Sequence, residues 1–189
     1  MPMDLPEIPR RTFGLLLLVF LGFSFVGYVI GMASPDTALR AVEKLIEQIG
    51  PISDSSFENF VKIFTNNSMV ALMMFVSGLF FGLGPWFIMA FNGLMVGLVV
   101  LAVHRMGDVP IGQIILGLIP HGVIEIPAIA IAGVAGIVWY RELVRGEGEA
   151  AERFKRGAVN GLKLYLLSVV LLLVAALIEA YVTPKVAGL

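Results

Sequence analysis

The feature that most limits how this chain can fold is an apolar run over residues 13–33 that contains no charged side chain. A helix needs about 20 such residues to cross a hydrocarbon core about 30 Å thick. Arg10 and Arg11 precede the run, as in a signal peptide, but the apolar core of a signal peptide is only roughly 7–15 residues long. We therefore expect an uncleaved membrane-spanning helix.

Further apolar runs fill most of the 189 residues, of which 58% are hydrophobic and 14% charged. Soluble domains are roughly 45–50% apolar and about 25% charged, so a soluble core could not hide this surface. We predict an all-α, polytopic integral membrane bundle that forms a single membrane domain over residues 1–189. About five spans are expected, at residues 13–33, 68–84, 85–103, 111–140 and 158–182.

Composition also excludes several kinds of function. Without cysteine the chain has no disulfide, thiolate nucleophile or cysteine metal cluster. A net charge of -1 gives no sign of a nucleic-acid partner. The lipid bilayer is the partner that the composition predicts.

Residues 36–67 differ from the apolar runs because charged and apolar side chains alternate there. Apolar residues recur at intervals of three and four within residues 39–49, and again within residues 57–64, where Asp54 or Ser55 can cap a second helix. We expect two amphipathic helices along the membrane interface. A loop packed on the protein fits the same pattern.

Residues 111–140 are too numerous for one straight span, and Pro120 interrupts them. Proline removes a backbone donor and clashes with the preceding helical turn. A helix broken or strongly kinked at Pro120 is therefore expected. Upstream, the turn-forming residues 82–85 predict a tight hairpin between two spans.

Basic residues predict the orientation, because Lys and Arg are retained on the cytoplasmic side. With five spans, one side has Arg10, Arg11, Arg141, Arg145, Arg153, Lys155 and Arg156, and the other has Arg40, Lys44, Lys62, Arg105 and Lys185. The first group is larger and mostly lies in one short loop. We predict a cytoplasmic amino terminus in a multi-pass protein of the cell membrane.

Glycines spaced four residues apart allow close helix packing in membranes. They occur as Gly27/Gly31, Gly78/Gly82, Gly93/Gly97 and Gly157/Gly161. This spacing predicts compact helix contacts and is compatible with a homo-oligomer.

Glu125 is the residue most indicative of a functional site, because residues 117–136 contain no other charged side chain. An ionised carboxylate in lipid costs several kcal/mol, so Glu125 must be paired, hydrated or protonated. His121 lies one helical turn earlier, which permits a hydrogen bond or a shared divalent metal ion such as zinc. A metal site usually needs three or four ligands, and without an HExxH motif an intramembrane metalloprotease is poorly supported. The two side chains could also simply satisfy each other.

Three asparagines are further candidates for a polar core. Asn92 lies midway along the predicted third span, and Asn66 and Asn67 precede the second. Single amides in membrane helices usually form interhelical hydrogen bonds. A helix cap explains Asn66 and Asn67 equally well.

The segments Phe64-Thr65-Asn66-Asn67, Phe91-Asn92-Gly93 and Pro120-His121-Gly122-Val123-Ile124-Glu125-Ile126-Pro127-Ala128 resemble the stage II sporulation protein M family, in its shorter archaeal and bacterial form. The resemblance covers roughly residues 57–136. It implies a polytopic membrane protein, which in spore-forming bacteria helps to anchor peptidoglycan-degrading proteins during engulfment. Matched to this pattern, the residues expected to form a shared polar core are Asn66, Asn67, Asn92, His121 and Glu125.

Two functions follow as hypotheses. The first is a non-enzymatic membrane scaffold or assembly protein with membrane or envelope protein partners, in which a dry polar cluster fixes the packing. The second is a transporter or an ion-binding protein that uses His121 and Glu125. A cavity that reaches Glu125 would favour the second hypothesis.

Overall fold

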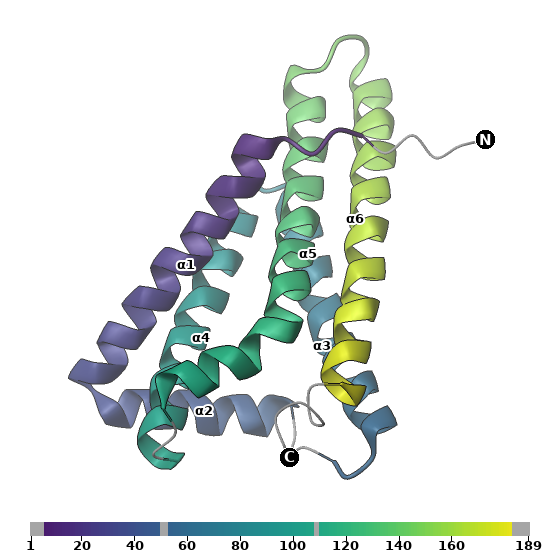
Figure 1. The fold of residues 1–189 in the computed structure, drawn as a ribbon. Helices are drawn as coiled ribbons and strands as arrows, with labels where there is room; N and C mark the ends of the chain where they lie inside the picture. Colours follow the sequence, from purple (N-terminus) through teal and green to yellow (C-terminus); the bar gives the residue numbers. More distant parts are fainter. Residues whose placement is uncertain (1–5, 50–52, 108–109, 183–189) are drawn as a thin grey trace.

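Six helices make up the structure, a computed structural model that describes residues 6–49, 53–107 and 110–182. They are α1 (Arg10–Ala33), α2 (Pro35–Ile49), α3 (Ser56–Ser77), α4 (Gly84–Gly107), α5 (Ile111–Arg145) and α6 (Ala150–Tyr181) (Figure 1). These three ranges contain no strand, which confirms the predicted all-α class.

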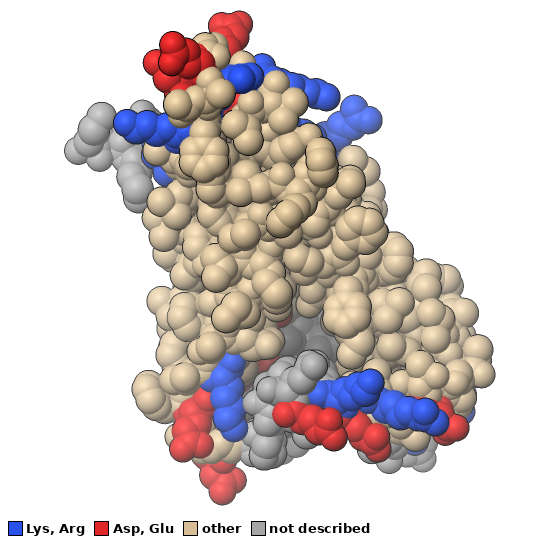
Figure 2. All heavy atoms as spheres, turned by 180° about the vertical axis from the view of Figure 1, so that it is seen from behind, with Lys and Arg blue, Asp and Glu red and all other residues tan. Residues whose placement is uncertain are grey.

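Five of these helices contain a segment long and apolar enough to cross a membrane. The segments are Arg10–Ala33, Ser56–Ser77, Gly84–Arg105, Gly122–Arg145 and Ala150–Tyr181. Figure 2 shows charged side chains gathered at the two ends of the molecule, with a broad uncharged band between them. This distribution matches a bilayer, whose hydrocarbon core excludes charge. The chain is a multi-pass membrane protein.

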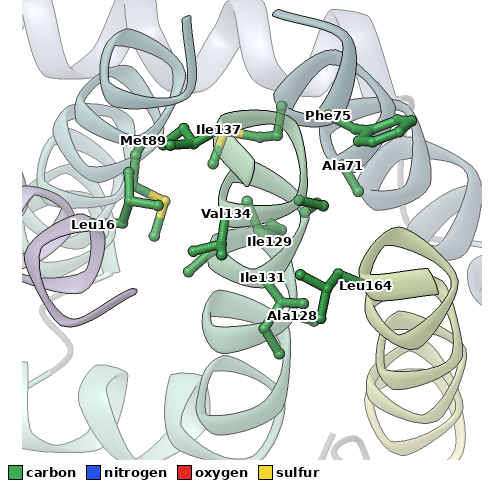
Figure 3. Packing of buried hydrophobic residues seen from close by; sticks show 14 of the residues in the cluster. Leu16, Ala71, Phe75, Met89, Ala128, Ile129, Ile131, Val134, Ile137 and Leu164 are labelled. Carbon is green, nitrogen blue, oxygen red and sulfur yellow. The ribbon is translucent and has the colours of Figure 1, made fainter. Parts of the chain in front are cut away.

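The centre of the bundle is α5, which contacts α1, α3, α4 and α6. Every residue from 128 to 137 is buried. In Figure 3, side chains of this segment meet Leu16 of α1, Phe75 of α3, Met89 of α4 and Leu164 of α6. Elsewhere, α1 packs mainly on α4, and α6 packs along α5.

Glycines produce the closest of these helix contacts. A Cβ added to Gly27 would overlap the carbonyl oxygen of Leu94 in α4, and one added to Gly97 would overlap that of Ser24 in α1. All eight glycines of the predicted close-packing pairs are buried within this one chain. Close packing is therefore an intramolecular property here, and the homo-oligomer stays a prediction.

The expected boundary between an interfacial helix and the second span is absent from α3, although Ser55, one of the two predicted caps, does begin the helix. Residues 57–64 do not form a separate interfacial helix, because α3 runs without interruption from Ser56 to Ser77. Ser55 caps it by accepting a hydrogen bond from the Glu58 backbone N–H at 3.4 Å. The helix therefore begins before the predicted span at residues 68–84, because Glu58 and Lys62 lower the hydropathy without interrupting it. It also ends earlier, at Ser77, and residues 78–83 form the turn before α4. Where the span itself begins and ends in a membrane stays a prediction.

The amphipathic helix α2 agrees with the periodicity of residues 39–49. Pro35 occupies the first position of α2, where a backbone N–H would have no hydrogen-bond acceptor within the helix. Ala38 is buried against Leu98 and Leu101 of α4, so α2 packs on the end of that helix. Its position in a membrane interface stays a prediction.

The predicted break at Pro120 is not confirmed. Residues from Ile111 to Arg145 form one continuous helix, α5. Figure 1 shows that the amino-terminal part of α5 bends across the direction of the remainder. A bent but unbroken helix keeps most backbone hydrogen bonds inside the segment, as a membrane environment requires.

At the opposite end, α5 and α6 form a hairpin that extends beyond α1 (Figure 1). Arg156 donates two hydrogen bonds to Oε1 of Glu142, from Nε at 3.1 Å and from Nη2 at 2.9 Å. Gly148 has a φ of 92° in the intervening turn, a conformation that glycine adopts without strain. The ion pair and the turn hold the hairpin closed.

Candidate functional site

A cavity of about 100 Å³ lies between α1, α4 and α5 and has room for several water molecules. Its lining is mostly apolar, with two polar side chains. The lining residues are Phe20, Met89, Asn92, Val96, Gly122, Glu125, Ile126 and Ile129. The cavity therefore brings together two of the predicted polar residues, which are far apart in the sequence.

Glu125 reaches the cavity from α5, within the apolar segment Gly122–Arg145. It lies one turn before the fully buried residues 128–137 and is itself partly exposed. Gly122 precedes it on the same helix face and has no side chain to fill the space beside it. Glu125 thus lines a cavity and is not enclosed by tightly packed side chains.

Asn92 reaches the same cavity from α4. Its Nδ2 donates a hydrogen bond to the carbonyl oxygen of Ile88, one turn earlier, at 2.8 Å. The bond keeps the donor end of the amide on its own helix and leaves Oδ1 as an acceptor. The interhelical hydrogen bond expected for this residue is therefore replaced by a bond within α4.

Asn66 and Asn67 lie on α3 and are not among the residues that line the cavity. Asn67 is buried, whereas Asn66 is exposed and its Nδ2 donates to Oδ1 of Asn67 at 3.4 Å. Both lie in the middle of α3, so neither caps the helix. The expected polar core is thus divided between α3 and the cavity.

The His121 side chain lies outside the part of the chain that the structure describes, although its backbone belongs to α5. The predicted His121–Glu125 pair and the metal site built on it are therefore outside the described residues as well. Among the side chains that are described, no group of three or more His, Asp or Glu residues could hold a metal ion.

Ser168 has a structural role that its sequence position did not reveal. It is fully buried in α6, and its Oγ donates a hydrogen bond to the carbonyl oxygen of Ala128 in α5 at 2.7 Å. A serine inside an apolar span is a typical sign of such an interhelical bond. The bond fixes α5 against α6 one turn from Glu125.

No sequence pattern predicts which apolar residues line the cavity. Phe20 and Met89 belong to spans with apolar residues on every face, so their position at the cavity depends on how α1 and α4 pack. Only the isolated polar residues could be found from the sequence.

Comparison with known proteins gives a match over most of the chain. The model of a family described as "Stage II sporulation protein M" matches residues 15–184. An uncharacterized protein of Methanocaldococcus jannaschii is 31% identical over 174 residues, which cover 91% of this chain and 95% of the relative. A second uncharacterized protein of that organism is 25% identical over 170 residues, covering 87% of this chain and 71% of its own. No solved structure matches.

Proposed function

Because the chain belongs to the stage II sporulation protein M family, and because that membership assigns no ligand, we propose a function from the cavity itself. The protein is a non-enzymatic, multi-pass membrane protein that binds a small cation between α1, α4 and α5, as an ion-binding protein or transporter does. The observation that supports this proposal is that Glu125 and Asn92, from different helices, line one cavity.

The physical argument starts from the cost of charge in an apolar environment. A carboxylate that lines a cavity with Phe20, Ile126 and Ile129 is stabilised by a partner side chain, by water, by a cation or by protonation. A dry polar cluster that only fixed packing would leave no space at the carboxylate. The cavity provides that space, so it favours ion binding over a purely structural cluster.

The test compares Glu125→Gln with Glu179→Gln in protein reconstituted into lipid nanodiscs. Glu179 belongs to α6 and does not line the cavity. Isothermal titration with simple salts should give cation binding to the wild type and to Glu179→Gln, and at least about tenfold weaker binding to Glu125→Gln. Equal binding by all three proteins would refute the proposal.

A scaffold or assembly role is the second candidate, and the α5–α6 hairpin favours it. The hairpin extends beyond α1 (Figure 1), and exposed Glu147, Glu149 and Glu152 surround its turn. The Arg156–Glu142 ion pair gives this turn a fixed shape. A soluble protein with a basic surface could bind there.

Charge reversal tests the scaffold role. Glu149→Lys with Glu152→Lys should abolish cross-links from the hairpin to partner proteins in membranes. Asp36→Lys with Glu43→Lys, on exposed positions of α2, is the matched control and should leave those cross-links intact. Unchanged cross-linking in the hairpin variant would exclude the hairpin as the assembly surface.

A further inference from the structure

We infer that the turn between α3 and α4, residues 78–83, stays inside the membrane and that its aromatic side chains bind lipid acyl chains just below the headgroups. The turn is then a lipid-binding surface and not a loop in water. This inference goes beyond the proposed function and does not depend on the cavity. The side chains of the turn, its backbone and its position along α5 each support it.

The side chains of the turn are apolar and exposed. Phe80 and Phe81 are 69% and 76% exposed, and Leu83 is exposed as well. The sequence contains no Asp, Glu, Lys or Arg from residue 63 to residue 103, so no charged side chain adjoins the turn along the chain. In water these side chains would form an exposed apolar patch, which is typical of an interaction site. Acyl chains match the chemistry of this patch.

The backbone of the turn pairs its own donors. The five consecutive N–H groups of residues 79–83 all donate to carbonyl oxygens of residues 76–80, at 2.9–3.2 Å. A backbone in contact with lipid needs such internal pairing, because the hydrocarbon offers no water as a partner. A loop in water has no such requirement. The hydrogen bonds of the turn therefore suit an apolar environment.

Phe81 has an unusual backbone conformation for an aromatic residue. Its φ is 55°, in the left-handed region that is unfavourable for residues with a Cβ. Glycine or asparagine is usual at such a position in a turn. A phenylalanine is retained here although its ring is mostly exposed. Contact of this ring with lipid would offset the backbone strain, whereas exposure to water would not.

Contacts with α5 place the turn next to the charged end of the molecule. An added Cβ at Gly78 would overlap the backbone of Gly136, and the rings of Phe81 and Tyr140 meet edge-on with centroids 6.2 Å apart. Arg141 follows Tyr140 directly, and the α5–α6 hairpin extends further in the same direction (Figure 1). The turn thus ends where charged residues begin, which is the level at which aromatic residues meet the headgroups.

Spin labels test this position directly, because the natural chain has no cysteine. Nitroxides are attached at Phe80→Cys, at Glu149→Cys in the hairpin turn, and at Leu18→Cys on the exposed face of α1. In nanodiscs, their accessibility to O₂, which concentrates in hydrocarbon, is compared with that to the polar nickel complex NiEDDA. We expect the O₂-to-NiEDDA ratio at Phe80→Cys to be close to that at Leu18→Cys and at least about threefold higher than at Glu149→Cys.

Two results would overturn the inference. A NiEDDA-dominated signal at Phe80→Cys, like that of Glu149→Cys, would show that the turn lies in water. Low accessibility to both reagents would show that protein covers the turn, either a second copy of the chain or a partner. If Phe80→Cys does not fold, Leu83→Cys provides the same measurement at another exposed position of the turn.

A charge placed in the turn provides an independent test. Phe80→Asp should lower the melting temperature in nanodiscs by at least about 3 °C relative to Phe80→Ala, because a carboxylate is unfavourable among acyl chains. Ala151→Asp, at an exposed position of the hairpin, is the control and should leave the melting temperature unchanged. Equal melting temperatures for Phe80→Asp and Phe80→Ala would contradict the inference.

Discussion

At the scale of single residues, polar side chains in the bundle have two different roles. Ser168 joins α5 to α6 through a buried hydrogen bond to the Ala128 carbonyl. Asn92 bonds within its own helix and lines the cavity. The first residue stabilises the fold around the cavity, and the second belongs to the cavity itself.

Ser168→Ala should therefore lower stability without removing cation binding. Interhelical hydrogen bonds in membrane proteins contribute about 0.6 kcal/mol on average and up to about 1.7 kcal/mol, and this one is short and fully buried. We expect a loss of about 1 kcal/mol in the free energy of unfolding, measured by denaturant titration in detergent.

Ser77→Ala is the control for that measurement. The Ser77 Oγ donates to the Met74 carbonyl within the same segment at 3.3 Å, in a partly buried position. Removing the Ser77 hydroxyl should lower the free energy of unfolding clearly less than removing the Ser168 hydroxyl does. Equal losses for the two variants would contradict a special role for the α5–α6 bond.

At the scale of helices, close packing of α1 on α4 depends on glycine. A side chain at Gly97 would meet the backbone of Ser24 and Tyr28, which cannot move aside as a flexible side chain can. Gly97→Ala should therefore separate the two helices and cost roughly 1–3 kcal/mol, the usual penalty for overpacking. Thermal unfolding in detergent would measure the loss.

Gly22→Ala is the matched control, because a Cβ added to Gly22 of α1 has nothing within 4 Å. Alanine is a better helix former than glycine by about 1 kcal/mol. The control should thus be as stable as the wild type or more stable. If Gly97→Ala were as stable as the wild type, that result would contradict the close contact between α1 and α4 at Gly97.

The helical class and the number of candidate spans could be predicted from the sequence, because span length and hydropathy are local properties. The cap of α3 was predicted as well, because Ser55 was one of its two candidates. The continuation of residues 57–64 into the following span was not, since Glu58 and Lys62 occur in a helix that continues through them. Glu125 and Asn92 were predictable as isolated polar residues in apolar segments. Their meeting at one cavity, and the place of Phe20 beside them, depend on tertiary packing that no local pattern encodes.

At the scale of the whole molecule, α1 begins and α6 ends at opposite ends of the bundle (Figure 1). Five membrane-spanning helices require this arrangement. The end that contains the α5–α6 hairpin also contains Arg10, Arg11, Arg141 and Arg145, all exposed. These residues are retained on the cytoplasmic side when they flank a span, so we expect that end to face the cytoplasm.

The natural chain contains no cysteine, so single substitutions can report this orientation without background. Glu149→Cys in the α5–α6 turn and Asp36→Cys at the start of α2 are both exposed and lie at opposite ends. In intact cells, a membrane-impermeant maleimide should label Asp36→Cys and should label Glu149→Cys only after permeabilisation. Labelling in the reverse order would show the opposite orientation, and labelling of both positions in intact cells would contradict the five-span topology.

Because the basic residues nearest the hairpin drive the orientation, replacing Arg141 and Arg145 with glutamine should increase the fraction of inverted molecules in the same assay.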